Sequence, residues 1–398
     1  MSQKLRIGMI CYPTHGGSGV VAVELAHELA EKGHEIHVIS YDTPLRLDLL
    51  RKNIFFHLVK VPAYPLFEYP PYSLALAAQT AEVVCRHNLD ILHAHYAIPH
   101  AMSAWLARQI SERIENLPII TTLHGTDITL VGNDPSYLST TKYSLNNCDN
   151  VTMVSHWLLE KVEEVLGCAC NHHVIYNFVD SNRFKPKKTN LRARLNSDSK
   201  IPILMHMSNF RPVKRVKDVA EIFLMMREKI PLKLVMVGDG PDRADVEVFL
   251  KQSPFADDVL FLGKQSKSED ILPAADLFVM TSNAESFGLA ALEAQSCGVP
   301  VIGYNAGGLS EVIANEETGL LVNVGEMQTL ADDAVELLND KKRYKRMSSS
   351  ARERASNKFS TKILIEEYER VYYTSIEILK DKYPESFLNR QDSHCKDS

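Results

Sequence analysis

"LRIGMICYPTHGGSGVVAVELAHELAEKGH", residues 5–34, joins a short apolar run to a helical pattern through a glycine-rich loop. The run at 5–10 predicts a strand, and the apolar residues that then recur at spacings of three and four predict a helix ending at Gly33. Glycines let backbone N–H groups approach a ligand, and a helix N-terminus carries partial positive charge. The loop therefore predicts an anion site, with phosphate as the first candidate. Glycines that only form a tight turn remain the alternative.

The spacing of the loop glycines narrows the choice of ligand. Gly16, Gly17 and Gly19 follow the pattern G-G-x-G. That pattern matches neither the dinucleotide motif G-x-G-x-x-G nor the P-loop, which also needs a Lys-Ser or Lys-Thr pair that is missing here. NAD binding and P-loop chemistry are therefore disfavoured.

Alternation of apolar runs with helical patterns along the chain predicts an α/β fold with parallel sheets wrapped by helices. The pattern restarts after residues 173–190, which are rich in Asn, Lys and Pro. We therefore expect two Rossmann-like, doubly wound domains, residues 1–180 and 181–361, facing a central cleft. A helix at about 362–382 is expected to pack back onto the first domain, and 384–398 to form a flexible tail.

Eleven apolar runs are the predicted strands, and ligands in such folds bind at the carboxyl ends of strands. The runs are residues 4–10, 34–40, 54–61, 90–96, 118–125, 150–155, 201–208, 232–240, 259–264, 276–282 and 299–304. The loops that follow them should carry the functional residues.

Composition and charge exclude several classes of partner. The 398 residues are 45% hydrophobic and 24% charged, as in an ordinary globular protein. The net charge of −6 arises in residues 1–180, where 12 Lys and Arg face 18 Asp and Glu. Nucleic acids and anionic membranes need concentrated positive charge, so a small-molecule substrate is favoured.

The targeting features of the sequence favour a cytoplasmic protein. The N-terminus enters a strand directly, without a signal segment, and no apolar stretch is long enough to span a bilayer. Seven scattered cysteines fit a reducing compartment better than a disulfide framework. A homodimer remains open.

The most specific stretch is "SNAESFGLAALEAQSCGVPVIGYNAGG", residues 282–308. It places Glu285 on a loop after a predicted strand, the sequence 287–289 at a helix start, and Glu293 inside that helix. A loop carboxylate beside free N–H groups can accept sugar hydroxyls while the N–H groups bind phosphate, and a carboxylate two turns deeper can bind another hydroxyl pair. Sugar and phosphate together indicate a nucleotide-sugar.

These motifs resemble the retaining glycosyltransferases of family 4. The shared features are E-x7-E with F-G-L-A between the carboxylates, the G-G loop at Gly16 and Gly17, and a closing A-G-G loop at Gly307 and Gly308. The resemblance covers nearly the whole chain and implies a GT-B fold and a UDP-sugar-dependent hexosyltransferase that uses no cofactor or metal. Several stretches, including "TLHGTDITLVGND" and "MSNFRPVKRVKDV", are similar to members that transfer N-acetylglucosamine from UDP-GlcNAc to L-malate in bacillithiol biosynthesis.

The resemblance also implies which residues bind the donor. They are Gly16, Gly17, Asn209, Arg211, Lys214, Glu285, Phe287, Gly288, Leu289 and Glu293. Glu285 is placed on the transferred sugar and Glu293 on the ribose. The family has a Lys five positions after its Arg, whereas here Lys214 follows Arg211 by three, so Arg215 remains an alternative partner for the diphosphate.

The expected catalytic residues are His124, Arg211, Lys214 and Glu285. The resemblance places His124 near the reacting sugar carbon; the alternative is that His124 is a buried core histidine without a catalytic role. The acceptor residues implied are Ser18, Tyr96, Thr126 and Asn177. Hydroxyl donors suit an acceptor that carries carboxylates. The implied mechanism is transfer on one face of the sugar, with the donor phosphate taking the acceptor proton, so the protein contributes positioning and charge.

Rival interpretations remain open. The histidines of "HAHYAIPH", residues 93–100, could bind a metal, but no carboxylate ligand stands nearby, and "CACNHH", residues 168–173, fits a surface loop better than a metal site. The same donor chemistry would also suit a UDP-sugar epimerase of this architecture, an inactive sugar-nucleotide sensor, or a transferase acting on another small or lipid acceptor.

Overall fold

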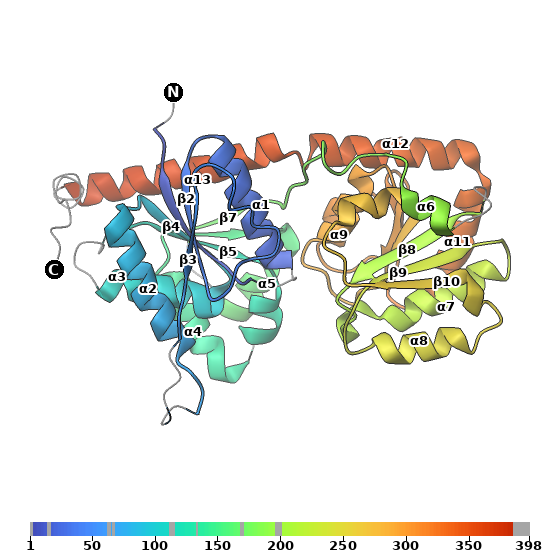
Figure 1. The fold of residues 1–398 in the computed structure, drawn as a ribbon, viewed down its shortest axis with the longest axis horizontal. Coiled ribbons are helices and arrows are strands. Elements are labelled where there is room, and N and C mark those ends of the chain that lie inside the picture. Colours follow the sequence, from blue (N-terminus) through green and yellow to red (C-terminus); the bar gives the residue numbers. More distant parts are fainter. Residues whose placement is uncertain are drawn as a thin grey trace. The chain divides into compact units, whose positions relative to one another are not determined.

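A computed structural model describes residues 3–13, 17–61, 65, 68–110, 116–132, 134–167, 171–195 and 201–384. The chain divides into an N-terminal unit, Met1–Tyr176 with Leu364–Ser398, and a C-terminal unit, Asn177–Ile363. Each unit holds one parallel sheet with helices packed on it (Figure 1), which confirms the predicted α/β class and the two Rossmann-like folds. Residues 385–398, nearly all of the predicted tail, lie outside the described residues.

The sheet of the N-terminal unit has the order β3-β2-β1-β4-β5-β6-β7, with every neighbouring pair parallel. Its strands are β1 (Arg6–Ile10), β2 (Glu35–Ser40), β3 (Ile54–Leu58), β4 (Ile91–His95), β5 (Ile119–Leu123), β6 (Asn150–Met153) and β7 (His172–Val174). The chain turns from β1 to β2 on one side and returns to β4 on the other. The carboxyl ends of β1 and β4 therefore flank a topological switch point, where ligands bind in such sheets.

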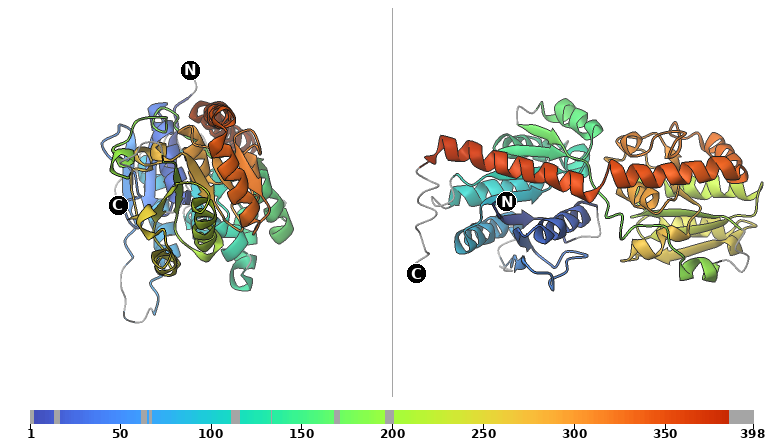
Figure 2. Two further views of the ribbon diagram at one scale, coloured as in Figure 1. Left: turned by 90° about the vertical axis from the view of Figure 1, so that its right-hand side faces the viewer. Right: turned by 90° about the horizontal axis from the view of Figure 1, so that it is seen from above.

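Six α-helices among the described residues belong wholly or mainly to this unit. They are α1 (Gly17–Glu31), α2 (Tyr72–His87), α3 (Met102–Ile110), α4 (Pro135–Asn146), α5 (His156–Leu166) and α13 (Thr361–Lys382). Helix α13, red in Figure 2, lies along this unit. Its Tyr372 hydroxyl is 2.7 Å from His93 Nδ1, and its Ser375 hydroxyl accepts a hydrogen bond from Asn150. Buried polar contacts of this kind fix the helix against β4 and β6.

The sheet of the C-terminal unit has the order β10-β9-β8-β11-β12-β13 and is also parallel. Its strands are β8 (Ile203–Ser208), β9 (Lys233–Gly238), β10 (Val259–Gly263), β11 (Leu277–Met280), β12 (Val301–Tyr304) and β13 (Gly319–Val322). Here β8 lies between β9 and β11, so the second switch point falls between the loops that follow β8 and β11.

The helices of this unit cover both faces of its sheet. They are α6 (Asn190–Leu195), α7 (Val216–Arg227), α8 (Arg243–Lys251), α9 (Leu289–Ser296), α10 (Leu309–Val312), α11 (Met327–Asn339) and α12 (Lys341–Asn357). Figure 1 shows α7 and α8 on one face and α9 on the other. Helix α7 buries Val216, Val219 and Phe223, whose spacings of three and four form one apolar stripe against the sheet. That packing fixes the position of the loop that precedes α7.

All eleven predicted strands are present, and the described residues hold two further strands that were not predicted. Buried parallel strands read as continuous apolar runs, which is why the central ones are recognisable. Strand β7 contains His172 and His173, both assigned to a loop from the sequence, and is largely exposed at the sheet edge. Strand β13 is a four-residue edge strand. Strand β7 is polar and solvated and so lacks the apolar signal, whereas β13, Gly-Leu-Leu-Val, is apolar but only four residues long.

Helix α1 begins earlier than its sequence indicated. Gly17 and Ser18 lie in its first turn, not in the loop before it. Glycine adopts helical and turn angles equally well, so composition could not locate the start of the helix. None of the described helices combines the length and the apolar character needed to cross a membrane.

Candidate active site

An ion pair joins the two loops at the switch point of the C-terminal unit. Lys214 Nζ donates a hydrogen bond to Glu285 Oε2 at 2.6 Å. Lys214 comes from the turn between β8 and α7, and Glu285 from the loop between β11 and α9. Their side chains are 19% and 15% exposed. The pair is thus mostly withdrawn from solvent while keeping one open side, which suits residues that receive a charged ligand.

Backbone contacts hold these two loops together. The Thr281 hydroxyl, at the end of β11, lies 2.9 Å from the carbonyl oxygen of Lys214. The N–H group of Asn283 donates to the carbonyl oxygen of Val213 at 2.9 Å. Both contacts satisfy backbone groups that a loop would otherwise leave unpaired. The position of the Lys214 side chain is therefore set by the neighbouring strand as well as by its own turn.

The two arginines near Lys214 differ in their contacts. Arg215 pairs with Asp218 at 2.7 Å, and its guanidinium lies over the ring of Tyr304. Arg211 is exposed and forms no ion pair within the described part of the chain. Arg215 is thus occupied in anchoring α7, while Arg211 keeps its charge available.

Glycines surround the backbone of Glu285. Gly308 N–H donates to the Glu285 carbonyl at 2.7 Å, and a Cβ atom on Gly307 would lie 2.2 Å from the same oxygen. Gly307 also has a φ of +63°, and Gly288 a φ of +99°. Only glycine fits positions that combine a left-handed backbone with such close approach. The two glycine segments therefore shape the loop that carries Glu285.

The remaining donor residues predicted from the stretch lie just before α9 and within it. Leu289 is the first residue of α9, and Phe287 is buried against Phe359 with ring centroids 5.6 Å apart. Glu293 is only 6% exposed, and the Ser268 hydroxyl lies 3.3 Å from its Oε2. The helix N-terminus and its free N–H groups are thus presented beside Glu285, as an anion site requires.

A second glycine turn belongs to this site and was missed from the sequence. Gly238 ends β9 and Gly240 follows it; Cβ atoms there would lie 1.8 Å from the Ser208 carbonyl oxygen and 2.0 Å from that of Asn209. The turn therefore packs directly on the loop that holds the predicted donor residues Asn209 and Arg211. The signal was present as "GDGP" immediately after an apolar run.

In the N-terminal unit, α1 presents its first turn at the carboxyl end of β1. Gly17 is exposed, and nothing lies within 4 Å of the position that a Cβ atom would take. Ser18 is half-buried in the same turn. The N–H groups of a first helical turn have no partner within the helix, so this end can bind an anion. Gly16 lies outside the described residues.

The loops after β4 and β5 bring two predicted acceptor residues together. Tyr96 Oη lies 2.8 Å from the hydroxyl oxygen of Thr126, which is exposed. Asp127 holds the second loop: its buried carboxylate accepts hydrogen bonds from the N–H groups of His124 and Gly125. Burial raises the pKa of Asp127 to about 6 although these N–H groups favour its charged form. Asp127 was not recognised from the sequence, and its neighbour Thr126 was the residue singled out.

The ring of His124 lies beside other histidines. Its Nε2 is 3.1 Å from His95 Nδ1, and burial lowers the pKa of His124 to about 3. His93 has both ring nitrogens engaged, at 2.7 Å from the hydroxyls of Tyr372 and Thr122. His124 is therefore neutral near pH 7. Cys168 and Cys170 of the other rival segment lie outside the described residues.

Asn177 is the first residue of the C-terminal unit. It is 6% exposed, and its Oδ1 has no hydrogen-bond partner among the described residues.

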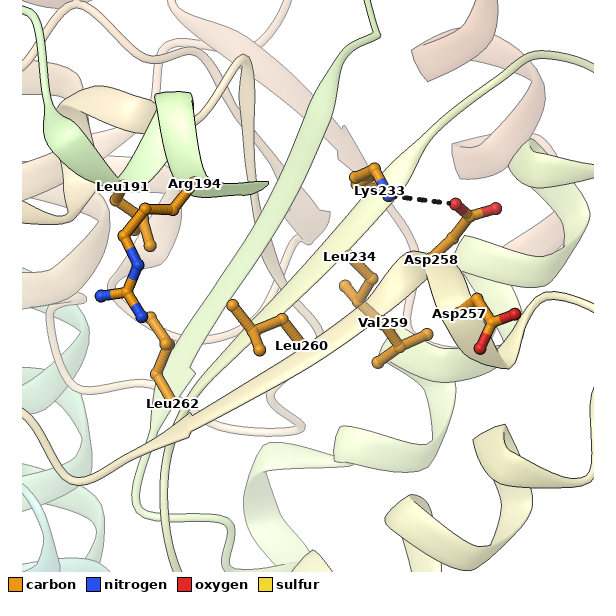
Figure 3. Close-up of a pocket in the computed structure, with 9 residues that line it drawn as sticks. All are labelled: Leu191, Arg194, Lys233, Leu234, Asp257, Asp258, Val259, Leu260 and Leu262. Carbon is orange, nitrogen blue, oxygen red and sulfur yellow. Dashed lines mark hydrogen bonds and ion pairs between the residues drawn. The ribbon is translucent and has the colours of Figure 1, made fainter. Parts of the chain in front are cut away.

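A pocket elsewhere in the C-terminal unit does not include the predicted residues. A cavity of about 280 Å³ lies between α6, the edge strand β10 and its neighbour β9. Figure 3 shows the side chains that line it. Arg194 and Lys233 line it together with Asp258, which pairs with Lys233 at 3.3 Å. It contains none of the residues at the carboxyl ends of β8 and β11.

Comparisons with known proteins agree with this geometry. Residues 15–183 match the family model "Glycosyltransferase Family 4", and residues 187–354 match "Glycosyl transferases group 1". Among solved structures, a glycosyltransferase from Rickettsia africae has a TM-score of 0.79 and 22% identity, covering 94% of this chain and 99% of its own. The Anabaena protein HepE bound to UDP and glucose has a TM-score of 0.77 and 20% identity, covering 92% and 99%.

The fold and these matches define the class: the chain belongs to the GT-B glycosyltransferases of family 4, enzymes that transfer a hexose from a sugar nucleotide. Within that class it is 46% identical over 380 residues to the N-acetyl-alpha-D-glucosaminyl L-malate synthase of Bacillus anthracis, covering 95% of this chain and 98% of that protein. It is 27% identical to the D-inositol 3-phosphate glycosyltransferase of Rhodococcus jostii, covering 86% and 81%. The resemblance seen in the sequence is confirmed.

Proposed function

We propose that the enzyme transfers N-acetylglucosamine from UDP-GlcNAc to the hydroxyl of L-malate with retention, giving GlcNAc-malate and UDP, the first step of bacillithiol biosynthesis. The observation that carries the choice of substrates is the 46% identity, along 95% of the chain, to a protein named for this product. The arrangement of charged groups around Glu285 supports the donor half of the proposal.

The C-terminal unit would bind the donor. Lys214 and Arg211 would contact the diphosphate, Glu285 the sugar hydroxyls and Glu293 the ribose. The cations would then stabilise the negative charge that develops on UDP as it leaves, which is where electrostatic catalysis is strongest. Because Lys214 already contacts Glu285, a diphosphate oxygen would share an ammonium group that the protein has positioned in advance.

The N-terminal unit would bind the acceptor. Malate carries two carboxylates, and the hydroxyls of Ser18, Tyr96 and Thr126 together with the first turn of α1 offer hydrogen-bond donors to them. The malate hydroxyl would attack the anomeric carbon on the face from which UDP departs and pass its proton to the departing phosphate oxygen. Neutral His124 would contact the donor sugar without acting as a base.

The proposal includes transfer without a metal, because Arg211 and Lys214 can neutralise the diphosphate. The decisive experiment measures UDP release from UDP-GlcNAc by EDTA-treated enzyme with and without L-malate, and identifies the product by mass spectrometry. Malate-dependent release with glycosylated malate supports the proposal. Release stimulated only by another acceptor would exclude malate as the acceptor and leave the proposed donor site standing. A reaction without malate that epimerises the sugar of UDP-GlcNAc would favour the epimerase.

We also propose a cytoplasmic location without stable membrane association. Cys11, Cys85, Cys148 and Cys297 are thiols, not disulfides, in the described part of the chain, and thiols suit a reducing compartment better than an oxidising one. Cell fractionation and a liposome-binding assay test this location, and sedimentation velocity decides between a monomer and a homodimer.

A further inference from the structure

Three histidines from three separate elements meet at the edge of the N-terminal sheet. His37 lies on β2, His57 on the edge strand β3, and His87 is the last residue of α2. One ring nitrogen from each lies within 4.8 Å of those of the other two. Within the described residues, these histidines are the one group of three potential metal ligands with this spacing. The proposed chemistry at Glu285 and His124 does not involve them.

The hydrogen bonds of His37 leave one nitrogen pointing into the cluster. Its Nε2 donates to Glu35 Oε1 at 2.8 Å, so in the neutral ring Nδ1 carries the lone pair. That Nδ1 faces His57 Nε2 at 2.8 Å. A carboxylate that holds the outer N–H group of a histidine is the usual support of a metal-binding imidazole, because it fixes the tautomer and raises the basicity of the ligand nitrogen.

The other two rings complete a three-sided arrangement. The His87 ring centroid lies 4.4 Å from that of His37 and 5.1 Å from that of His57. His37 is fully buried, whereas His57 and His87 are partly exposed, so solvent reaches the open side. The nearby cations have their own partners: Arg86 pairs with Glu82 at 2.6 Å and Arg6 with Asp90 at 3.3 Å.

We propose that His37, His57 and His87 form a binding site for Zn²⁺, with Glu35 supporting His37 and water at the fourth position. Three imidazoles and one open position are a familiar tetrahedral zinc set. Zn–N bonds of about 2.0–2.1 Å place two ligand nitrogens about 3.3 Å apart, so the His37 and His57 rings need to separate by about half an ångström. The proton of neutral His57 moves from Nε2 to Nδ1, and the metal replaces the hydrogen bond between the two rings.

The site would join the edge strand β3 to α2. It involves no group assigned to the sugar nucleotide or the acceptor, so it is independent of the proposed function. Zinc binding should raise the thermal midpoint of the protein, since a ligand that binds only the folded state stabilises it.

The test uses the untagged full-length protein, stripped with EDTA and dialysed, and titrated with ZnCl₂ by calorimetry. We expect one Zn²⁺ per chain, and Co²⁺ should give the visible absorption bands of a tetrahedral site. His57→Gln and His87→Gln should each weaken Zn²⁺ binding at least about tenfold, and Glu35→Gln about tenfold through loss of support for His37. Transfer activity should stay within about twofold of wild type in His57→Gln.

His172→Gln is the matched control, because it removes a histidine from another edge strand and from the rival segment at 168–173. It should bind Zn²⁺ as wild type does. The proposal is overturned if wild type binds no stoichiometric Zn²⁺, if binding survives both His57→Gln and His87→Gln unchanged, or if His172→Gln abolishes it. His57 and His87 are partly exposed, so both variants should fold, and circular dichroism checks that they do.

Discussion

Lys214 Nζ and Glu285 Oε2 are 2.6 Å apart although the two residues are 71 positions apart in the chain. The contact exists because β8 and β11 are neighbours in the sheet, so the loops at their carboxyl ends meet. Removing one member of a mostly buried pair leaves the other charge poorly solvated. The pair is therefore a prearranged set of charges whose function can be tested by removing either side.

Lys214→Ala should lower kcat/KM for UDP-GlcNAc by about 10²–10³, the usual cost of losing one group that stabilises developing negative charge. Steady-state UDP release in the presence of acceptor measures the loss, and a urea-unfolding curve shows whether the fold survives. Lys229→Ala is the matched control, because Lys229 pairs with Asp332 on the surface of the same unit. Near-normal turnover by a folded Lys214→Ala enzyme would show that the ion pair is only structural.

Comparing Gly307→Ala with Gly325→Ala distinguishes the effect of displacing Glu285 from the effect of backbone strain alone. A Cβ atom there meets the Glu285 carbonyl oxygen at 2.2 Å, so the loop must move. Gly325 also has a positive φ, +92°, but nothing lies within 4 Å of its Cβ position. Both alanine variants should lose about 1–2 kcal/mol of stability from the left-handed backbone, with Gly307→Ala losing more because of the clash.

Only Gly307→Ala should lose transfer activity by more than about tenfold, since a displacement of about 1 Å at a catalytic group has large kinetic effects. Paired measurements of unfolding free energy and kcat/KM on the two variants provide the check. Equal activity losses in Gly307→Ala and Gly325→Ala would mean that general destabilisation, and not the position of Glu285, is responsible.

Tyr96→Phe and Thr126→Ala should each raise KM for the acceptor several-fold, to about tenfold, and leave KM for UDP-GlcNAc unchanged. The two hydroxyls lie 2.8 Å apart, so each variant removes one hydrogen-bond donor from a potential carboxylate site. Varying malate at saturating donor, and then donor at saturating malate, separates the two constants. Tyr137→Phe, an exposed tyrosine on α4, is the control. If only KM for UDP-GlcNAc changed, Tyr96 and Thr126 would be assigned to the donor site instead of the acceptor site.

The sequence allowed the central strands to be predicted because buried parallel strands are apolar throughout, as in 201–208 and 299–304. The glycines near Glu285 were recognised because close approach and positive φ demand glycine, as at Gly288 and Gly307. These features depend on the chemistry of neighbouring residues in the chain, which the sequence shows directly.

Contacts between distant segments could not be predicted in the same way. The supporting role of Asp127 depends on the path of the loop after β5, and the meeting of His37, His57 and His87 depends on strand order and on where α2 ends. Asp127 follows Thr126 directly, yet only the folded loop shows that its carboxylate points back to the N–H groups of His124 and Gly125. Tertiary pairing of this kind leaves no periodic signal.

His206→Gln should reduce the loss of stability in acid. His206 is buried within β8, where Nδ1 donates to the Val279 carbonyl at 2.9 Å and Nε2 accepts from the Ser208 hydroxyl at 2.8 Å. Burial lowers the pKa of His206 to about 4, below its ordinary value of 6.5. Between these values the unfolded chain binds the proton and the folded chain does not, so stability is present above pH 6.5 and is lost as pH falls toward 4.

At about 1.4 kcal/mol per pH unit, His206 accounts for a loss of about 3 kcal/mol over that window. Other buried histidines add to the wild-type loss, so the informative quantity is the difference between the wild-type and His206→Gln profiles. Urea unfolding of the full chain at pH 4.5, 5.5 and 6.5 gives the free energy of unfolding as a function of pH. The slope of this profile should be smaller in the variant, by the equivalent of about one proton. Parallel profiles would mean that His206 is protonated in the folded protein, and that its hydrogen bonds to Val279 and Ser208 tolerate the charge.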